Sequence, residues 1–198
     1  GAYALQLVSR DGGLVASSGG IRLATEPMAD ETEPDTLIVV GGVVFALEVH
    51  PGEIAFDYYS TKKLLEKFAD RPEFGLNFDP SHLVWMGIDP VTAMTPYVDR
   101  IAHAQAKDIE LFAEKRNRYG WPGIAVDRED PWNVGWWRYR VPGLGEVDWR
   151  RVVDALYEHG FDGVLSVEHE DPVWGGTEPK IKTGLRIAHR TLRPLMVD

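Results

Sequence analysis

The sequence contains no cysteine among its 198 residues. This absence excludes disulfide bonds, zinc sites built from thiolates, and a cysteine nucleophile. The absence also fits a reducing compartment. We therefore expect a cytoplasmic protein whose chemistry depends on other side chains.

Long apolar runs and an excess of basic residues are also missing. No apolar run approaches the ~20 residues that a membrane span needs, and the N-terminus lacks the basic region and apolar core of a signal peptide. The 31 Asp and Glu residues outnumber the 21 Lys and Arg residues, which gives a net charge of −10. This charge argues against nucleic acid or an anionic membrane as a partner.

The length fits one domain with an added segment, and 44% hydrophobic residues is normal for a globular protein. Residues 1–42 are predicted to be β-rich, with a hairpin that turns at Gly19 and Gly20. The hairpin strands lie at 14–18 and 21–24, and two further strands are predicted at 3–9 and 36–42.

Residues 43–198 change to strand–helix units, which predict a parallel α/β sheet with right-handed crossovers. The helix signals are local: Ser60 or Thr61 as one cap, Asp89 before Pro90 as another, and Gly160 as a stop. The expected strands are 43–49, 74–79, 101–107 and 163–168, and the expected helices lie near 60–69, 91–98, 148–159 and 177–192.

The stretch 109–147 is too long for an ordinary connection, and loops of this size are usually functional or disordered. Disordered segments are poor in aromatic residues. This stretch contains several, including Trp121, Trp136 and Trp137. We expect an ordered lid over the strand ends.

Each predicted strand of residues 43–198 ends in a carboxylate or an imidazole. Because parallel strand ends meet at one edge of a sheet, these side chains should converge and form a divalent-metal site. The residues are Glu48, Asp79, His82, His103 or Gln105, and Glu168.

Three of these residues have a structural alternative. Glu48 could form an ion pair with Lys or Arg, and Asp79 with His82 could belong to a turn or a helix cap. Gln105 shares a strand face with His103, and its amide binds transition metals less well than imidazole does. Glu48 and Glu168 could also act as an acid–base pair.

Three basic side chains are candidates for substrate contacts. Lys107 could bind substrate hydroxyls or form a surface ion pair. Arg138 and Arg140 could bind hydroxyls, a carboxylate or a phosphate. Their stems could equally pack over the neighbouring aromatic rings.

Residues 43–198 resemble the sugar phosphate isomerase/epimerase family, the xylose isomerase-like TIM barrels. The resemblance implies that Mn²⁺, Mg²⁺ or Co²⁺ is held by Glu48, Asp79, Glu168 and Gln105, the last in place of a histidine. It also implies that the two glutamates move a proton on a sugar or sugar phosphate and that His82 lies near the metal. It rests on the stretches 46–51, 77–82, 103–108, 142–149 and 166–172.

The resemblance begins at the fifth strand of the barrel, so residues 43–198 correspond to its second half. Residues 1–42 resemble instead a fragment of the class I glutamine-amidotransferase-like (ThiJ/PfpI), flavodoxin-like fold, and the chain then reads as a chimera. Four strands cannot close an eight-stranded barrel. Either the N-terminal strands cover the open sheet, or a homo-oligomer completes it.

Three functions follow from this interpretation. The first is a metal-dependent sugar isomerase or epimerase. The second is an inactive remnant that still binds a metal or a sugar. The third is a recombined chimera with no activity.

Overall fold

The computed structural model describes residues 8–9, 13–16, 22–27, 45–120 and 135–196. The chain divides into two compact units, Gly1–Phe45 and Ala46–Asp198, and each is treated by itself. The sequence-based division after residue 42 stays a prediction. No helix within the described residues is long and apolar enough to cross a membrane.

The first unit contains a small three-stranded sheet in the order β1-β3-β2. Strands β2 (Gly13–Ala16) and β3 (Arg22–Pro27) pair antiparallel, which confirms the predicted hairpin. Strand β1 (Val8–Ser9) pairs parallel to β3. The strand predicted at 36–42 and the start of the one predicted at 3–9 lie outside the described residues.

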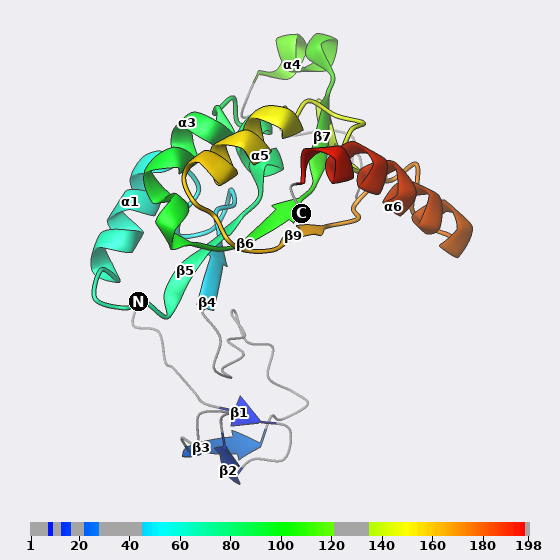
Figure 1. Ribbon diagram of the computed structural model, residues 1–198. Helices are drawn as coiled ribbons and strands as arrows, with labels where there is room; N and C mark the ends of the chain where they lie inside the picture. The colour runs from blue at the N-terminus through cyan, green and yellow to red at the C-terminus, as the bar shows by residue number, and fades with distance from the viewer. Residues whose placement is uncertain (1–7, 10–12, 17–21, 28–44, 121–134, 197–198) are drawn as a thin grey trace. The chain divides into compact units, whose positions relative to one another are not determined.

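The second unit is built on a four-stranded sheet in the order β4-β5-β6-β9 (Figure 1). The strands are β4 (Phe45–Glu48), β5 (Phe74–Phe78), β6 (Ile101–Ala106) and β9 (Leu165–Val167). Strand β6 pairs parallel with both β5 and β9. The predicted α/β architecture of βα repeats is therefore confirmed, and each strand falls within its expected range.

Four helices follow the strands in the predicted places. They are α1 (Tyr58–Lys67), α3 (Pro90–Met94), α5 (Trp149–Glu158) and α6 (Glu178–Leu192). Helix α3 is shorter than predicted, because the chain tightens into the 3₁₀ helix η1 (Thr95–Arg100). A second 3₁₀ helix, η2 (Arg193–Leu195), ends the described chain.

The helix caps explain where these helices begin and end. Asp89 caps α3 as predicted, and Gly160 follows α5 with a φ of +77°. The predicted cap of α1 is wrong, because Asp57 caps this helix and Ser60 lies at its third position. Ser60 completes a capping box in which it bonds back to the Asp57 backbone.

The sequence analysis missed several short elements. Helix α2 (Pro80–Trp85) begins directly after Asp79, whose side chain caps it. The segment expected to be a lid contains β7 (Asp108–Leu111), α4 (Ala113–Tyr119) and β8 (Trp137–Arg140). Strands β7 and β8 pair antiparallel, and residues 121–134 lie outside the described residues.

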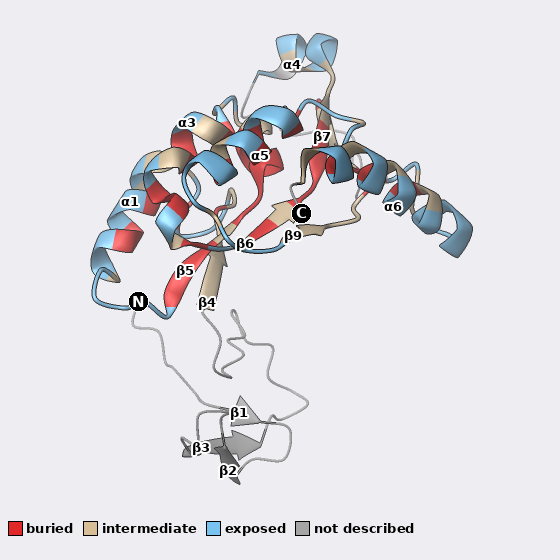
Figure 2. Ribbon diagram, in the orientation of Figure 1, coloured by how far each residue is buried: buried red, intermediate tan, exposed pale blue. Residues whose placement is uncertain are grey.

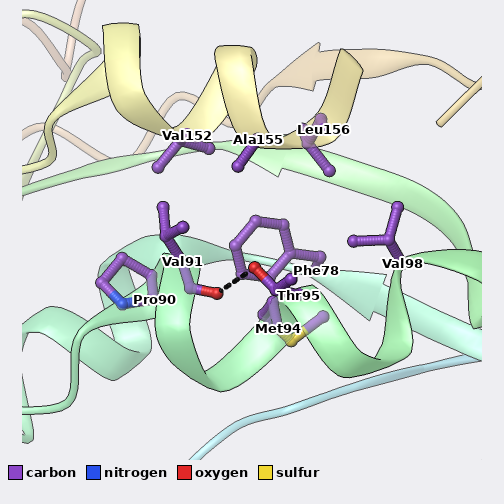
Figure 3. A pocket seen from close by; sticks show the side chains of 9 residues that line it. All are labelled: Phe78, Pro90, Val91, Met94, Thr95, Val98, Val152, Ala155 and Leu156. Carbon is purple, nitrogen blue, oxygen red and sulfur yellow. Dashed lines mark hydrogen bonds between the residues drawn. The ribbon is translucent and has the colours of Figure 1, made fainter. Parts of the chain in front are cut away.

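Helices α1, α3 and α5 lie on one side of the sheet and turn their buried faces toward it (Figures 1 and 2). Between α3 and α5 lies a small apolar hollow (Figure 3). Its only hydroxyl among the lining side chains belongs to Thr95, which donates to the Val91 carbonyl at 2.7 Å. The hollow therefore serves packing. The lining residues are Phe78, Pro90, Val91, Met94, Thr95, Val98, Val152, Ala155 and Leu156.

Candidate metal centre

Strand alternation separates the apolar core from the polar residues of the sheet. On β5, Leu76 and Phe78 are buried in the core, so Asn77 and Asp79 point to the other face. On β6, Ala104 and Ala106 are fully buried, and the residues between and after them take the polar face. The strand ends therefore present polar side chains on the face away from α3 and α5.

Glu48, Asp79 and His82 form a compact cluster at the carboxyl ends of β4 and β5. Their candidate ligand atoms all lie within 4.8 Å of one another. His82 Nε2 is 3.2 Å from Glu48 Oε1 and 3.3 Å from Asp79 Oδ2. His82 comes within reach because Asp79 starts helix α2, which carries the imidazole back over the strand end.

The two oxygens of Asp79 have different roles. Oδ1 accepts the Ser81 backbone N–H at 2.8 Å and so caps α2. Oδ2 accepts no hydrogen bond of good geometry from the described residues, although the side chain is completely buried. A buried carboxylate oxygen without a donor is costly unless a cation lies beside it.

Lys107 supplies that cation in the structure. Its Nζ lies 3.1 Å from Asp79 Oδ2, 3.1 Å from Glu168 Oε2 and 3.2 Å from Glu170 Oε2. Lys107 follows β6 and is only 3% exposed. We call Glu48, Asp79, His82, Lys107, Glu168 and Glu170 together the acidic centre.

Burial and charge push the pKa values of the two glutamates in opposite directions. For Glu48, burial opposes ionisation, but the hydrogen bond and charge of His82 outweigh burial and lower the pKa. For Glu168, burial is the largest cause and raises the pKa in spite of the opposing charge of Lys107, and the nearby Asp79 and Glu170 carboxylates add to the rise. Glu48 therefore ionises more easily than Glu168.

The buried pair of Asp79 and Lys107 shows a related imbalance. Burial raises the pKa of Asp79 even though His82 and Lys107 both favour its charged form. Burial alone would lower the pKa of Lys107, but the surrounding carboxylates raise it. The ammonium thus stays charged because several carboxylates surround it, whereas its charge does not offset the burial of Asp79.

Aromatic rings close one side of the acidic centre. Tyr139 Oη lies 3.1 Å from His82 Nδ1, so the hydroxyl orients the imidazole. The Tyr139 ring also lies under Lys107, with Nζ 4.5 Å from the ring centroid. His50 packs edge-on against His82 at a centroid distance of 4.2 Å. These contacts limit how the imidazole can turn.

Two of the predicted site residues, Gln105 and His103, lie on β6 and bond to side chains of the two neighbouring strands, β5 and β9. The Gln105 Oε1 atom accepts the Asn77 amide N–H at 2.7 Å. His103 Nε2 lies 2.7 Å from Ser166 Oγ. The oxygen that the resemblance assigns to the metal at Gln105 is therefore engaged with Asn77.

The arginines predicted to contact substrate are bound within the protein. Arg138 Nε donates to Glu110 Oε2 at 2.7 Å. Arg140 Nε donates to Asp171 Oδ2 at 3.0 Å, and Arg140 also pairs with Glu110. Their role in substrate binding stays a prediction.

Two members of this region, Glu170 and Tyr139, were not among the predicted site residues. Glu170 could have been found by strand alternation, because it shares a face with Glu168. Tyr139 could have been found in the same way, since it lies between Arg138 and Arg140 on β8 and must face the opposite side. In both cases the signal was the period of two along a strand.

The donor set of the acidic centre fits a divalent ion. Glu48, Asp79 and His82 offer two carboxylates and an imidazole, a ligand set that Zn²⁺, Mn²⁺ and Co²⁺ accept. The buried Asp79 Oδ2 without a hydrogen-bond donor from the described residues is a ready ligand atom. Glu168 Oε2 is in the same condition, and both oxygens lie 3.1 Å from Lys107 Nζ.

Fold and centre together define a class: an α/β protein whose parallel strands carry a candidate metal centre at their carboxyl ends. Residues 24–193 match the family described as xylose isomerase-like TIM barrel, and the chain belongs to that family. The resemblance drawn from residues 43–198 is thus confirmed. The match begins inside residues 1–42 and gives no support to a flavodoxin-like fragment there.

Several relatives show the same relationship. The chain is 30% identical over 152 residues to an uncharacterized protein, YfiH, of Bacillus subtilis (strain 168), covering 71% of this chain and 47% of that protein. It is 34% identical over 110 residues to inosose dehydratase of Lacticaseibacillus casei, covering 54% of this chain and 35% of the enzyme. A crystal structure of an IOLI protein with a zinc atom superposes with a TM-score of 0.55 at 21% identity, covering 79% of this chain and 51% of that chain.

The chain therefore spans about half the length of YfiH and of the IOLI protein, and about a third of the length of the inosose dehydratase. A complete barrel has eight strands, and the main sheet here has four. The comparison with the zinc-bearing structure establishes the fold alone at its level of identity.

Proposed function

We propose that this chain carries the metal-binding half of an enzyme that moves a proton on a sugar or a related cyclic polyol, as an isomerase or epimerase. The main observation in support of this proposal is the cluster of Glu48, Asp79 and His82 at the carboxyl edge of the sheet. The zinc atom in the IOLI structure and the inosose dehydratases among the relatives support a divalent ion and a polyol substrate.

The protein groups have distinct tasks in this proposal. Glu48, Asp79 and His82 would hold the ion, with Glu168 beside them. A divalent ion there would polarise a carbonyl of the substrate and acidify the neighbouring C–H bond. Tyr139 holds the His82 ring in orientation through its hydroxyl.

The opposite pKa directions of the two glutamates suit a proton transfer. Glu48, with its lowered pKa, takes the proton from the carbon beside the carbonyl, and the C–H electron pair moves toward the carbonyl oxygen. Glu168, with its raised pKa, returns a proton. Return to the former carbonyl carbon gives isomerisation when the hydroxyl proton on the first carbon passes to the former carbonyl oxygen, so that a new carbonyl forms there. Return to the opposite face of the same carbon re-forms the original carbonyl and gives epimerisation.

Dehydration, the activity named for the inosose dehydratases, is a second reaction that would begin with the same step. After the proton leaves, the electron pair forms a C=C bond as a hydroxyl group departs on the next carbon. The departing hydroxyl takes up a proton and leaves as water. The similarity to inosose dehydratase favours this candidate.

Binding without turnover is the third candidate, and the contact between Gln105 and Asn77 favours it. An amide in place of imidazole is a weaker ligand for transition metals, and here its oxygen already accepts a hydrogen bond. This chain would then bind a metal ion or a polyol and catalyse nothing.

Deuterium exchange separates turnover from binding. We would incubate the protein with Mn²⁺, Co²⁺ or Zn²⁺ and a panel of ketoses and inososes in D₂O, and follow the carbon beside the carbonyl by NMR. We expect deuterium to enter with wild type and with Glu158→Gln, an exposed control, but not with Glu168→Gln. A metal-dependent rise in melting temperature without deuterium entry would contradict turnover and support binding alone.

A further inference from the structure

The Lys107 ammonium lies among carboxylates that the proposed function assigns to the metal. An ammonium has three N–H donors, and Nζ has a carboxylate oxygen at 3.1, 3.1 and 3.2 Å. The partners are Asp79, Glu168 and Glu170. The ammonium thus lies at ion-pair distance from three carboxylates, and the side chain is 3% exposed.

The remaining side of the ammonium is covered by the Tyr139 ring, with Nζ 4.5 Å from its centroid. A cation enclosed by three carboxylates and an aromatic face makes the same kind of contacts that a metal ion would seek. Lys107 is therefore an internal counter-cation of the acidic centre. It reaches this position because it lies two residues after Gln105 and so points to the same face of the sheet.

The ammonium and a divalent ion would compete for one oxygen atom in particular. Asp79 Oδ2 lies 3.1 Å from Lys107 Nζ and 3.3 Å from His82 Nε2. This oxygen therefore belongs both to the carboxylates around Lys107 and to the Glu48, Asp79 and His82 cluster. Two cations that share one carboxylate oxygen repel each other strongly in a buried site.

We propose that Lys107 is a built-in competitor of the metal: the ion binds Asp79 and Glu168 only when the Lys107 ammonium moves away from them. Glu170 is the partner that the ammonium can keep. Its side chain is 35% exposed, whereas that of Asp79 is fully buried, and it is not among the assigned ligands. Lys107 thus sets the affinity of the centre for its ion. This inference depends on the proposed metal binding and on no particular reaction.

Metal titration of lysine variants tests the competition. Lys107→Met keeps most of the side-chain volume and removes the charge. Lys62→Met is the control, since Lys62 is about half exposed and pairs only loosely with Glu66 at 4.0 Å. We expect calorimetry to show that Zn²⁺ binds Lys107→Met at least about tenfold more tightly than wild type, and that Lys62→Met matches wild type.

The melting temperature should show the same exchange of cations. In EDTA we expect Lys107→Met to melt below wild type, because its buried carboxylates have lost their counter-cation. Saturating Zn²⁺ should reverse that order. If Lys107 instead holds the carboxylates in place for the ion, Lys107→Met will bind Zn²⁺ more weakly than wild type, and the proposal is overturned.

A measurement on wild-type protein keeps the test valid if Lys107→Met does not fold. Amine acetylation followed by peptide mass spectrometry should find Lys107 protected in EDTA and reactive after Zn²⁺ is added, with Lys62 reactive in both. A Zn²⁺-induced rise in melting temperature with Lys107 still protected would overturn the competition alone. No Zn²⁺ response in wild type or in Lys107→Met would overturn the metal site itself, and the competition with it.

Discussion

Two groups of buried carboxylates lie side by side in the sequence and differ in how their oxygens are satisfied. Asp108 follows Lys107, and Asp171 follows Glu170. Asp108 accepts four N–H donors, from Ile109, Val147 and Gly143 of the backbone and from the Trp149 indole, at 2.8 to 3.0 Å. We call Asp108 and Asp171, with the partners Glu110, Arg138 and Arg140, the anchor network.

Asp171 is satisfied in the same way as Asp108. Its oxygens accept the backbone N–H groups of Val141, Val173 and Trp174 and the Nε–H of Arg140. Burial opposes its charge, but these donors outweigh burial and lower its pKa. Asp108 and Asp171 have no oxygen left for a ligand, so they fix the chain around β7 and β8.

The acidic centre shows the opposite condition. Asp79 Oδ2 and Glu168 Oε2 accept no well-formed hydrogen bond from the described residues and depend on Lys107. The comparison teaches that burial alone does not identify a functional carboxylate. The useful signal is a buried oxygen that faces a side-chain ammonium rather than several fixed N–H donors.

The largest difference in stability is expected when a buried aspartate is changed to asparagine in each of the two regions. Asp108→Asn places an amide NH₂ among N–H donors, and we expect it to lower the free energy of unfolding by about 3 kcal/mol. Asp79→Asn keeps the cap of α2 and removes a charge that burial already opposes. We expect a loss of less than about 1 kcal/mol.

Urea unfolding in EDTA measures both values, and the exposed cap Asp89→Asn serves as the control for changing an aspartate at a helix start. The distinction between the two regions would break down if Asp79→Asn cost as much as Asp108→Asn. Asp79 would then be a structural anchor as well.

This contrast marks how far the sequence could predict the site. Strand ends and the shared face of Glu48, Asp79 and Glu168 follow from periodicity alone, and the structure brings them to one edge. The partner of Asp79 could not be predicted, because it depends on the path that the Lys107 side chain takes across the sheet. Two of the four donors around Asp108, Gly143 and Val147, come from a loop whose conformation no local pattern specifies.

The fold divides in the same way. The main strands and longer helices were predicted because hydrophobic periodicity and caps such as Asp89 are local signals. Helix α2 was missed because the Pro80 that starts it also fits a turn. Strands β7 and β8 were missed because their pairing spans a long separation in sequence, and only tertiary contacts select it.

Arginine substitutions test the anchor network from its cationic side. Arg140 is 11% exposed and bonds to the buried Asp171, so we expect Arg140→Gln to lower the free energy of unfolding by about 2 kcal/mol. Arg138 is 32% exposed, and its one carboxylate partner among the described residues is Glu110. We expect Arg138→Gln to cost about 0.5 kcal/mol.

Urea unfolding and Zn²⁺ titration would be run on both arginine variants. Neither change should alter Zn²⁺ affinity, because both arginines bond outside the acidic centre. Weaker Zn²⁺ binding by Arg140→Gln would show that the anchor network also supports the metal ligands. The two regions would then not be independent.

The smallest expected effect is a difference in the sign of pH dependence between two glutamates of similar exposure, Glu110 at 30% and Glu168 at 28%. Burial opposes ionisation of Glu110, but Arg138 and Arg140 lower its pKa below 4.5. It therefore stabilises the fold above pH 4.5 and loses this contribution as the pH falls through its folded pKa. Burial raises the pKa of Glu168 above 4.5, so the fold loses stability as the pH rises from 4.5 through the folded pKa.

We would measure the free energy of unfolding of Glu110→Gln, Glu168→Gln and wild type in EDTA from pH 3 to pH 8. The difference between each variant and wild type isolates the contribution of one glutamate, because the contributions of the other titrating groups cancel. The deficit of Glu110→Gln relative to wild type should shrink below pH 4.5. The free energy of unfolding of Glu168→Gln should instead rise relative to that of wild type above pH 4.5. We expect each change to stay below about 1 kcal/mol, since water screens side chains this exposed. Slopes of the same sign would mean that Lys107 holds the Glu168 carboxylate as firmly as the arginines hold Glu110, and the acidic centre would then be a closed ion-pair network with no oxygen to spare for a metal.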